Sequence, residues 1–358
     1  MPDLYPELPT PTLLLDIDKL ESNIHRLQDL CDRHQVELRP HIKTHKMVEV
    51  ARRQLAAGAA GLTCAKIGEA EAMLPSGVKS IFIAHSLVDP NQAGRLRALA
   101  DQLETLYLAC TSLAHAPALE KVAAAIGRRM PVMMAVDTGL HREGTRSKED
   151  ALNLAALIRR SPHLDLQGLY THEGHVGGVA DTAGAIVEAH ARLMEINAAL
   201  GGLPKIWPGC TTSSREMAAL PGVTAIRPGA YVLGDGPSVY LKHLLEWDQV
   251  ALTILATVVD RPEPGLALID AGSKVFSSDR TAANVFGMDR DQKWQVTRVN
   301  EEHGYIISEN ANLLSVGDRV HFMPAHVCTA VNLTDAVTVV QKGKVVGKWK
   351  IDARGRVN

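Results

Sequence analysis

The sequence predicts an α/β fold, a (β/α)8 barrel followed by a C-terminal all-β domain. Between about residues 36 and 240, short β-like runs alternate eight times with amphipathic helical stretches. From about residue 245, helical periodicity is scarce and further β-like runs follow one another. The alternative for the first part is an open doubly wound sheet. No GxGxxG motif opens a helix after the first strand, and this disfavours the alternative.

The barrel strands are predicted from apolar runs, and the helices between them from apolar residues spaced three and four apart. The eight predicted strands are Val36–Ile42, Gly61–Ala65, Ser80–His85, Thr105–Thr111, Met130–Asp137, Leu164–His172, Lys205–Gly209 and Thr224–Leu233. The predicted helices include Met47–Ala57, Asn91–Ala100, Ala116–Ile126, Lys148–Arg160 and Ala183–Leu200.

The rest of the chain is predicted to form the second domain. Its expected strands are Val250–Val259, Leu266–Ile269, Trp294–Val299, Tyr305–Ile307, Arg319–Met323 and Ala336–Val340, the last leading into a hairpin that turns at Lys342 and Gly343. We place the barrel at residues 18–242 and the β domain at 243–358, with residues 1–17 pairing with the β domain.

Composition excludes several classes of protein. The 358 residues contain 38 Lys and Arg against 40 Asp and Glu, with no basic block, so we expect no nucleic-acid partner. No apolar run is long enough to span a bilayer, and the N-terminus lacks the pattern of a secretory signal. The five scattered cysteines contain no CxxC pair, as is typical of reduced thiols. We therefore expect a cytoplasmic protein with no membrane partner.

Polar and ionisable residues collect where the predicted barrel strands end. Barrel enzymes place their active sites at the carboxyl ends of the strands. The residues at these ends are Lys43, Cys64, Ala65, Lys66, His85, Asp137 to Arg142, His172, Glu173, His175, Gly209 to Ser214, Gly229, Ala230 and Tyr231. The opposite ends carry fewer such groups, and this asymmetry indicates an enzyme.

Lys43 is the candidate nucleophile. It lies in a segment, residues 39–46, that holds two lysines and two histidines within six positions. A lysine desolvated at the mouth of an apolar barrel has a lowered pKa, and its free amine can form a Schiff base with an aldehyde. The alternative is a solvated basic end of a strand.

The loop after the seventh strand, residues 209–214, reads Gly-Cys-Thr-Thr-Ser-Ser and precedes a helical stretch. Hydroxyls and backbone N–H groups at such a position bind anions, and barrels often hold phosphate with their last two loops. The alternative is an ordinary Ser/Thr helix cap. Together with Lys43, the loop suggests an aldehyde cofactor with a phosphate group, and pyridoxal 5'-phosphate fits.

His326 and Cys328 form a second cluster, in the β domain. In a strand, residues two apart point to the same face, so imidazole and thiolate make a plausible two-ligand zinc site. Alone, such a pair is more often part of the core. Because catalytic zinc normally has three protein ligands, water or substrate would complete the shell.

Four motifs resemble the D-serine dehydratase and D-threonine aldolase family of pyridoxal-phosphate enzymes, which have the alanine-racemase fold. They are Arg-Pro-His-Ile-Lys-Thr-His-Lys at 39–46, Gly-Leu-Tyr-Thr-His-Glu-Gly-His at 168–175, Arg-Pro-Gly-Ala-Tyr-Val-Leu-Gly-Asp at 227–235 and Pro-Ala-His-Val-Cys-Thr-Ala-Val-Asn-Leu at 324–333. The resemblance covers nearly the whole chain.

The resemblance implies a homodimer with Lys43 as the Schiff-base lysine and a divalent metal at His326 and Cys328. It implies phosphate contacts from Gly209, Thr211, Thr212, Gly229 and Tyr231, and places Arg142 near the cofactor ring. The His-x-Cys and Thr-His-Glu-Gly-His motifs look more like the D-serine dehydratase branch, which includes 3-hydroxyaspartate dehydratases. The loop at 209–214 departs from the usual family sequence, so the resemblance identifies the phosphate-contact residues in this loop only to within one position.

The expected activity is β-elimination of a D-3-hydroxy amino acid to a 2-oxo acid and ammonia. Lys43 would take the α-proton, and a metal, zinc in preference to manganese or magnesium, would assist departure of the hydroxyl. The alternative is retro-aldol cleavage to glycine and an aldehyde, with His172 or His175 as the base. A further alternative is a non-catalytic pyridoxal-phosphate carrier, although a carrier needs no metal site.

Overall fold

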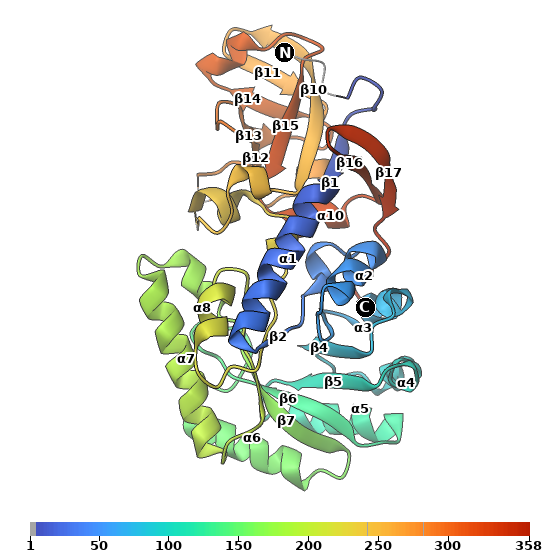
Figure 1. The fold of residues 1–358 in the computed structure, drawn as a ribbon, viewed down its shortest axis with the longest axis vertical. Helices are drawn as coiled ribbons and strands as arrows, with labels where there is room; N and C mark the ends of the chain where they lie inside the picture. Colours follow the sequence, from blue (N-terminus) through green and yellow to red (C-terminus); the bar gives the residue numbers. More distant parts are fainter. Residues whose placement is uncertain (1–4, 242, 282) are drawn as a thin grey trace. The chain divides into compact units, whose positions relative to one another are not determined.

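The chain folds into two units in a computed structural model that describes residues 5–241, 243–281 and 283–358 (Figure 1). One unit, the β unit, contains residues 5–25, 44–49 and the described part of 230–355. The other, the barrel unit, contains residues 26–43, 50–229 and 356–358. The predicted domain limits, 18–242 for the barrel and 243–358 for the β domain, stay a prediction. Of the N-terminal segment 1–17, predicted to pair with the β domain, residues 1–4 lie outside the described residues.

Eight parallel strands make up the barrel unit. They are β2 (Glu37–Leu38), β3 (Leu62–Cys64), β4 (Ser80–Ser86), β5 (Thr105–Cys110), β6 (Met130–Ala135), β7 (Leu164–Tyr170), β8 (Lys205–Trp207) and β9 (Ala225–Ile226). Strands β3 to β8 form one sheet in chain order, and β2 pairs with β9. Backbone hydrogen bonds from Thr63 to Pro40 (2.8 Å) and from Thr224 to Ile206 (3.0 Å) join the two sheets. The predicted (β/α)8 barrel is confirmed.

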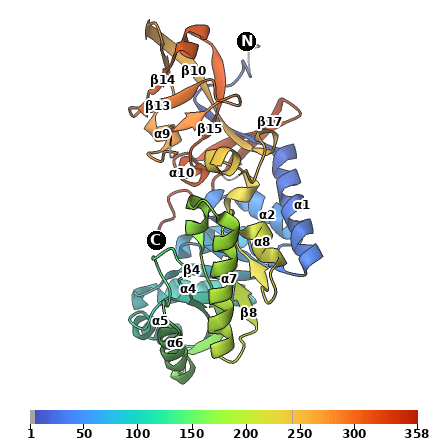
Figure 2. The same ribbon diagram turned by 90° about the vertical axis from the view of Figure 1, so that its left-hand side faces the viewer.

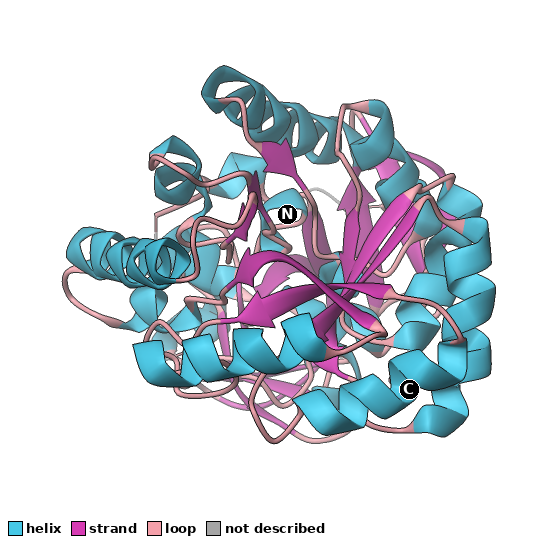
Figure 3. Cartoon of the chain, turned by 90° about the horizontal axis from the view of Figure 1, so that it is seen from below, coloured by secondary structure: helices cyan, strands magenta, loops and turns pink. Residues whose placement is uncertain are grey.

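Helices lie outside the barrel strands (Figure 3). They are α3 (Ile67–Met73), α4 (Ala93–Gln102), α5 (Ala116–Ile126), α6 (Lys148–Arg160), α7 (Thr182–Ala199) and α8 (Ser214–Ala219), while α1 (Ile17–His34) and α2 (Val48–Ala56) contain residues of both units. In α5 the buried residues are Ala116, Leu119, Val122, Ala123 and Ile126, a single helical face. Among the described residues, no helix is long and apolar enough to cross a membrane.

Aromatic side chains fill the interior of the barrel. Trp207, which is 1% exposed, makes edge-to-face contacts with Tyr107 and Phe82 at ring-centroid distances of 4.9 and 5.7 Å. Two buried arginines lie against these rings: the guanidinium of Arg39 is 4.3 Å from the Trp207 ring, and that of Arg227 is 5.5 Å from Phe82. Cationic groups are thus part of the barrel core.

The β unit contains a closed ring of six strands, several of which are visible in Figure 2. The ring runs through β10 (Leu252–Glu263), β11 (Leu266–Ile269), β14 (Gly304–Ile307), β13 (Gln295–Val299), β12 (Gly287–Met288) and β15 (Arg319–Pro324) back to β10. Strands β1 (Thr12–Asp16), β16 (Ala336–Gln341) and β17 (Lys344–Lys350) extend the sheet from β10. β1 pairs antiparallel with β10 and parallel with β16. The predicted C-terminal all-β domain is confirmed.

The hairpin predicted at Lys342 and Gly343 is also confirmed. Gln341 pairs with Lys344, and the two residues between them have φ of 48° and 74°. Positive φ at both central positions is the geometry of a type I′ turn, which glycine favours.

Two predicted barrel strands are much longer than the observed ones. The run Val36–Ile42 contains only β2, and Lys43 lies on a 3-10 turn, Ile42–Thr44, rather than at a strand end. The run Thr224–Leu233 contains only β9, and Tyr231 lies on a 3-10 turn, Ala230–Val232, rather than in a strand. Pro40 and Pro228 lie two residues beyond the last residues of these strands, and proline has no N–H to donate to a ladder.

The strand predicted at His326 to Cys328 is wrong. His326 is the N-cap of α10 (Val327–Asn332), so Cys328 lies in the first turn of a helix. The apolar residues Val327, Ala330 and Val331 are buried at helical spacing. The two side chains still meet, although the geometry that brings them together is not the one predicted.

Candidate active site

Lys43 is held at the carboxyl end of the barrel strands. Its backbone N–H donates to Nδ1 of His41 (3.4 Å), and the N–H of His41 donates to the carbonyl of Pro228 after β9 (2.9 Å). His41 also forms a parallel bridge with Thr63 on β3. Lys43 is half-buried and lies close enough to His172 to influence its ionisation. Its backbone is therefore fixed by the barrel strands on either side of β2.

His172 follows β7 and is a neutral imidazole. Burial lowers its pKa to about 3, and the positive charges of Lys43, Arg142 and Arg227 add to the effect. Its Nδ1 is 3.4 Å from the carbonyl oxygen of Gly209. A neutral histidine beside several cations can donate or accept a hydrogen bond without carrying charge.

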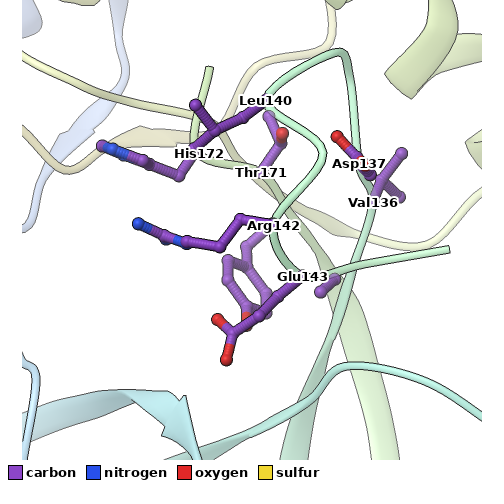
Figure 4. Close-up of a pocket in the computed structure, with 9 residues that line it drawn as sticks. Val136, Asp137, Leu140, Arg142, Glu143, Thr171 and His172 are labelled. Atoms are coloured by element: carbon purple, nitrogen blue, oxygen red, sulfur yellow. The ribbon is translucent and has the colours of Figure 1, made fainter. Parts of the chain in front are cut away.

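Arg142 is on the loop after β6, which lines a small pocket together with Tyr170, Thr171 and His172. Figure 4 shows the side chains of Arg142 and His172 extending in the same direction. Asp137 anchors this loop, because its Oδ1 accepts from the N–H groups of Gly139 and His141 at 3.0 Å. The Arg142 side chain is exposed, so it is available to a bound molecule.

Glu173 organises the loop at residues 209–214 from inside the protein. This buried carboxylate accepts from the backbone N–H of Gly209 (3.2 Å) and from Oγ of Ser213 (2.5 Å). Burial raises the pKa of Glu173. Ser213 makes no capping hydrogen bond to α8, because its hydroxyl donates to Glu173 instead. The loop is therefore more than an ordinary helix cap.

Gly209 is required at the start of this loop. Its φ is 140°, and a Cβ there would lie 2.5 Å from the backbone nitrogen of Arg227. Thr211 is half-buried, and Thr212 and Gly229 are buried. These residues belong to the barrel unit, whereas Tyr231, 5% exposed, belongs to the β unit.

His175 lies on a 3-10 turn, Gly174–Gly178, and packs on the loop after β6. A Cβ on Gly139 would lie 2.6 Å from its Nε2. Its buried Nδ1 has no hydrogen-bond partner among the described residues. His175 therefore supports the Arg142 loop, and its predicted catalytic role stays a prediction.

His326 and Cys328 meet in the β unit. A hydrogen bond to Cys328 raises the pKa of His326 to about 9, and the charges of Cys328, Asp235 and Asp279 add to this while burial opposes it. Sγ of Cys328 is also 3.2 Å from Oγ1 of Thr44, the residue after Lys43. Among the described residues, no group of three or more His, Cys, Asp and Glu side chains is arranged to hold a metal ion.

The residues present fit both groups that the sequence predicts. The 209–214 loop carries several hydroxyls and backbone N–H groups, and the positive charges of Arg142 and Arg227 act on the neighbouring His172, so this end of the barrel suits an anionic phosphate. Imidazole and thiol in contact form a donor set that suits zinc better than magnesium.

Sequence reasoning assigned no role to Glu173, Arg227 or Asp279. Glu173 stands between the two candidate histidines of the 168–175 motif, and this position was the available signal. Arg227 opens the 227–235 motif but looked like a strand residue. Asp279 lies in no motif, and only the fold brings it to His326.

Two family models and several known proteins are similar to this chain. The family model for the alanine racemase N-terminal domain matches residues 15–237, and the model described as "Putative serine dehydratase domain" matches residues 251–340. A D-threonine aldolase of Arthrobacter sp is 32% identical over 97% of this chain and 93% of its own length.

Two solved structures are similar along their length. The D-threonine aldolase of Filomicrobium marinum is 25% identical, with a TM-score of 0.89, and the match covers 99% of this chain and 98% of that one. A mutant of D-threo-3-hydroxyaspartate dehydratase in a metal-free form is 28% identical, with a TM-score of 0.85 and coverage of 96% and 97%. The chain therefore belongs to the alanine racemase N-terminal domain family, has the alanine-racemase fold, and is a pyridoxal-phosphate-dependent lyase.

Proposed function

We propose that this lyase catalyses β-elimination of a D-3-hydroxy amino acid to a 2-oxo acid and ammonia. The observation that carries the proposal is the contact between the imidazole of His326 and the thiol of Cys328. A nitrogen–sulfur pair favours zinc, a Lewis acid suited to assisting a hydroxyl leaving group. The solved D-threo-3-hydroxyaspartate dehydratase mutant, described as a metal-free form, adds support for a metal.

In this proposal Lys43 holds the cofactor and, once free, takes the α-proton of the substrate. Pyridoxal phosphate, when bound, supplies an electron sink for the bond broken at Cα. Glu173 fixes Gly209 and Ser213, so that the loop can hold the phosphate through its backbone N–H groups. Arg142 is the cationic partner for the cofactor ring or the substrate carboxylate.

His172 has two possible functions, depending on the reaction. In elimination its neutral imidazole orients the substrate by hydrogen bonding without adding positive charge near Lys43. In retro-aldol cleavage the same imidazole would take the proton of the β-hydroxyl. Retro-aldol cleavage is the second candidate function, favoured by the similarity to the D-threonine aldolase of Arthrobacter sp.

Product analysis distinguishes the two reactions. The holoenzyme, loaded with zinc, is incubated with D-serine, D-threonine and D-3-hydroxyaspartate, and with the L-enantiomers as controls. We expect a 2-oxo acid and ammonia in equal amounts from a D-substrate and little product from the L-forms. Glycine and an aldehyde as the dominant products would reject the proposal in favour of the aldolase reaction. A Lys43→Ala variant controls for contaminating activity.

A further inference from the structure

Asp279 lies against the imidazole of His326. Its Oδ2 is 3.0 Å from Nδ1 of His326, and both residues belong to the β unit. The same oxygen accepts from Oγ1 of Thr329 at 2.8 Å. Asp279 is 47 residues from His326 in the chain, so no local sequence pattern explains this contact.

A small network fixes the Asp279 side chain. The backbone N–H of Asp279 donates to Oγ of Ser277 (3.1 Å), and that hydroxyl donates to Oγ1 of Thr329 (3.0 Å). Thr329 in turn donates to Asp279, which closes the ring of hydrogen bonds. Because Thr329 is one residue after Cys328 on α10, the network ties the carboxylate to the helix that carries the thiol.

The contact occupies one of the two imidazole nitrogens of His326. A carboxylate at Nδ1 favours the tautomer with the proton on Nδ1, which leaves Nε2 with a lone pair for a metal. Carboxylates in this position orient a metal-binding histidine and raise its basicity. Asp235 is the other acidic residue that influences His326, but its Oδ1 accepts from the N–H and Oγ of Ser238.

We infer that Asp279 is the positioning residue of the metal site: it holds His326 so that Nε2, together with Sγ of Cys328, binds the ion. The inference rests on the proposed metal site at His326 and Cys328. A site with only two protein ligands depends strongly on the orientation of each one. Asp279 acts through His326 and is not itself a ligand in this account, in keeping with the absence of a three-residue ligand group among the described residues.

The test is the zinc affinity of the full-length holoenzyme, measured by competition with a chromophoric chelator. Removing an outer-shell partner typically weakens metal binding about 10–100-fold, and we expect this for Asp279→Ala. Asp279→Asn keeps an oxygen that can accept from Nδ1, so its loss should be smaller. The Asp279 side chain is 37% exposed, so neither change should prevent folding. Asp335→Ala is the matched control, an 88% exposed aspartate of the same unit, and should bind zinc as the wild type does.

Variants of the ligands separate failure of this inference from failure of the metal site. If Asp279→Ala binds zinc within twofold of the wild type while His326→Ala and Cys328→Ala lose it, the inference is overturned and the site stands. If all three variants bind zinc normally, the site lies elsewhere and both are overturned.

Nitrogen-15 NMR of the histidine rings gives a readout that general destabilisation would not mimic. The His326 signals are assigned by their absence in His326→Ala. In the zinc-loaded wild type we expect a metal-shifted Nε2 and a protonated Nδ1. Coordination through Nδ1 would contradict the inference, because Asp279 could not then occupy that nitrogen.

Discussion

Replacing Glu173 with alanine should destabilise the barrel unit and loosen the loop at residues 209–214. Glu173 is fully buried, and its two carboxylate oxygens accept from the N–H of Gly209 and the hydroxyl of Ser213. Alanine provides no acceptor, so both donors lose their partner in a place that water reaches poorly. Arg227, also buried, loses the nearby carboxyl group at the same time.

The size of the effect follows from these contacts. A buried donor left without a partner costs about 1–3 kcal/mol. Ser213 can turn its hydroxyl towards the carbonyl of Cys210, 3.5 Å away. The free-energy cost of removing its bond to Glu173 is therefore at the lower end of this range. We therefore expect Glu173→Ala to lower the free energy of unfolding by about 3 kcal/mol. With a urea m-value of about 3 kcal/mol/M, the midpoint falls by about 1 M.

Urea unfolding followed by far-ultraviolet circular dichroism measures this change. Glu173→Gln keeps one acceptor oxygen, so its urea midpoint should lie between those of the wild type and Glu173→Ala. Glu71→Ala is the control, because Glu71 forms a two-bond ion pair with Arg95 on the surface of the same unit. Such pairs contribute about 0–1 kcal/mol. A Glu173→Ala midpoint no lower than that of Glu71→Ala would show that the buried contacts of Glu173 do not stabilise the barrel unit.

Three further predictions follow from the same structure. A strong chelator should abolish turnover but leave the visible absorbance of the cofactor, since the proposed metal residues do not include Lys43; loss of both together would contradict separate sites. Burial, with the charge of Lys19, lowers the pKa of His321 to about 4, below the ordinary 6.5. As the pH falls, His321 therefore takes up its proton in the unfolded chain before it does so in the folded protein. Stability should therefore fall between pH 6.5 and about pH 4, by up to about 1.4 kcal/mol per pH unit, and His321→Gln should flatten this slope. NMR titration should show no protonation of His172 between about pH 8 and pH 5, and a midpoint near 6.5 would show that the site is more open to water.

The barrel could be predicted because each strand–helix unit carries its own pattern. β5 is a buried run, and the helix after it, Ala116–Ile126, shows one apolar face with the bounds that were predicted. The strand limits beside Lys43 and Tyr231 could not be predicted from apolar runs alone. There Pro40 and Pro228 have no N–H to donate to a ladder while the surrounding residues remain buried, so the burial pattern continues after the strand has ended.

The site could be predicted in part. Residues that share a motif, such as His172 and Glu173, could be found together, but which one faces the loop depends on the turn after β7. The strand predicted at His326 to Cys328 is wrong because the burial of Val327, Ala330 and Val331 at helical spacing outweighs the two-residue spacing of His326 and Cys328. Asp279 could not be found at all, because its contact with His326 depends on the closed ring of β strands.

The most direct test of the account is the position at which the cofactor attaches, because both elimination and retro-aldol cleavage require it. The yellow holoenzyme is reduced with borohydride, digested, and its labelled peptide identified by mass spectrometry. We expect a single modified residue, Lys43, and loss of the label in Lys43→Ala. Modification at Lys46 or Lys66 in place of Lys43 would contradict it.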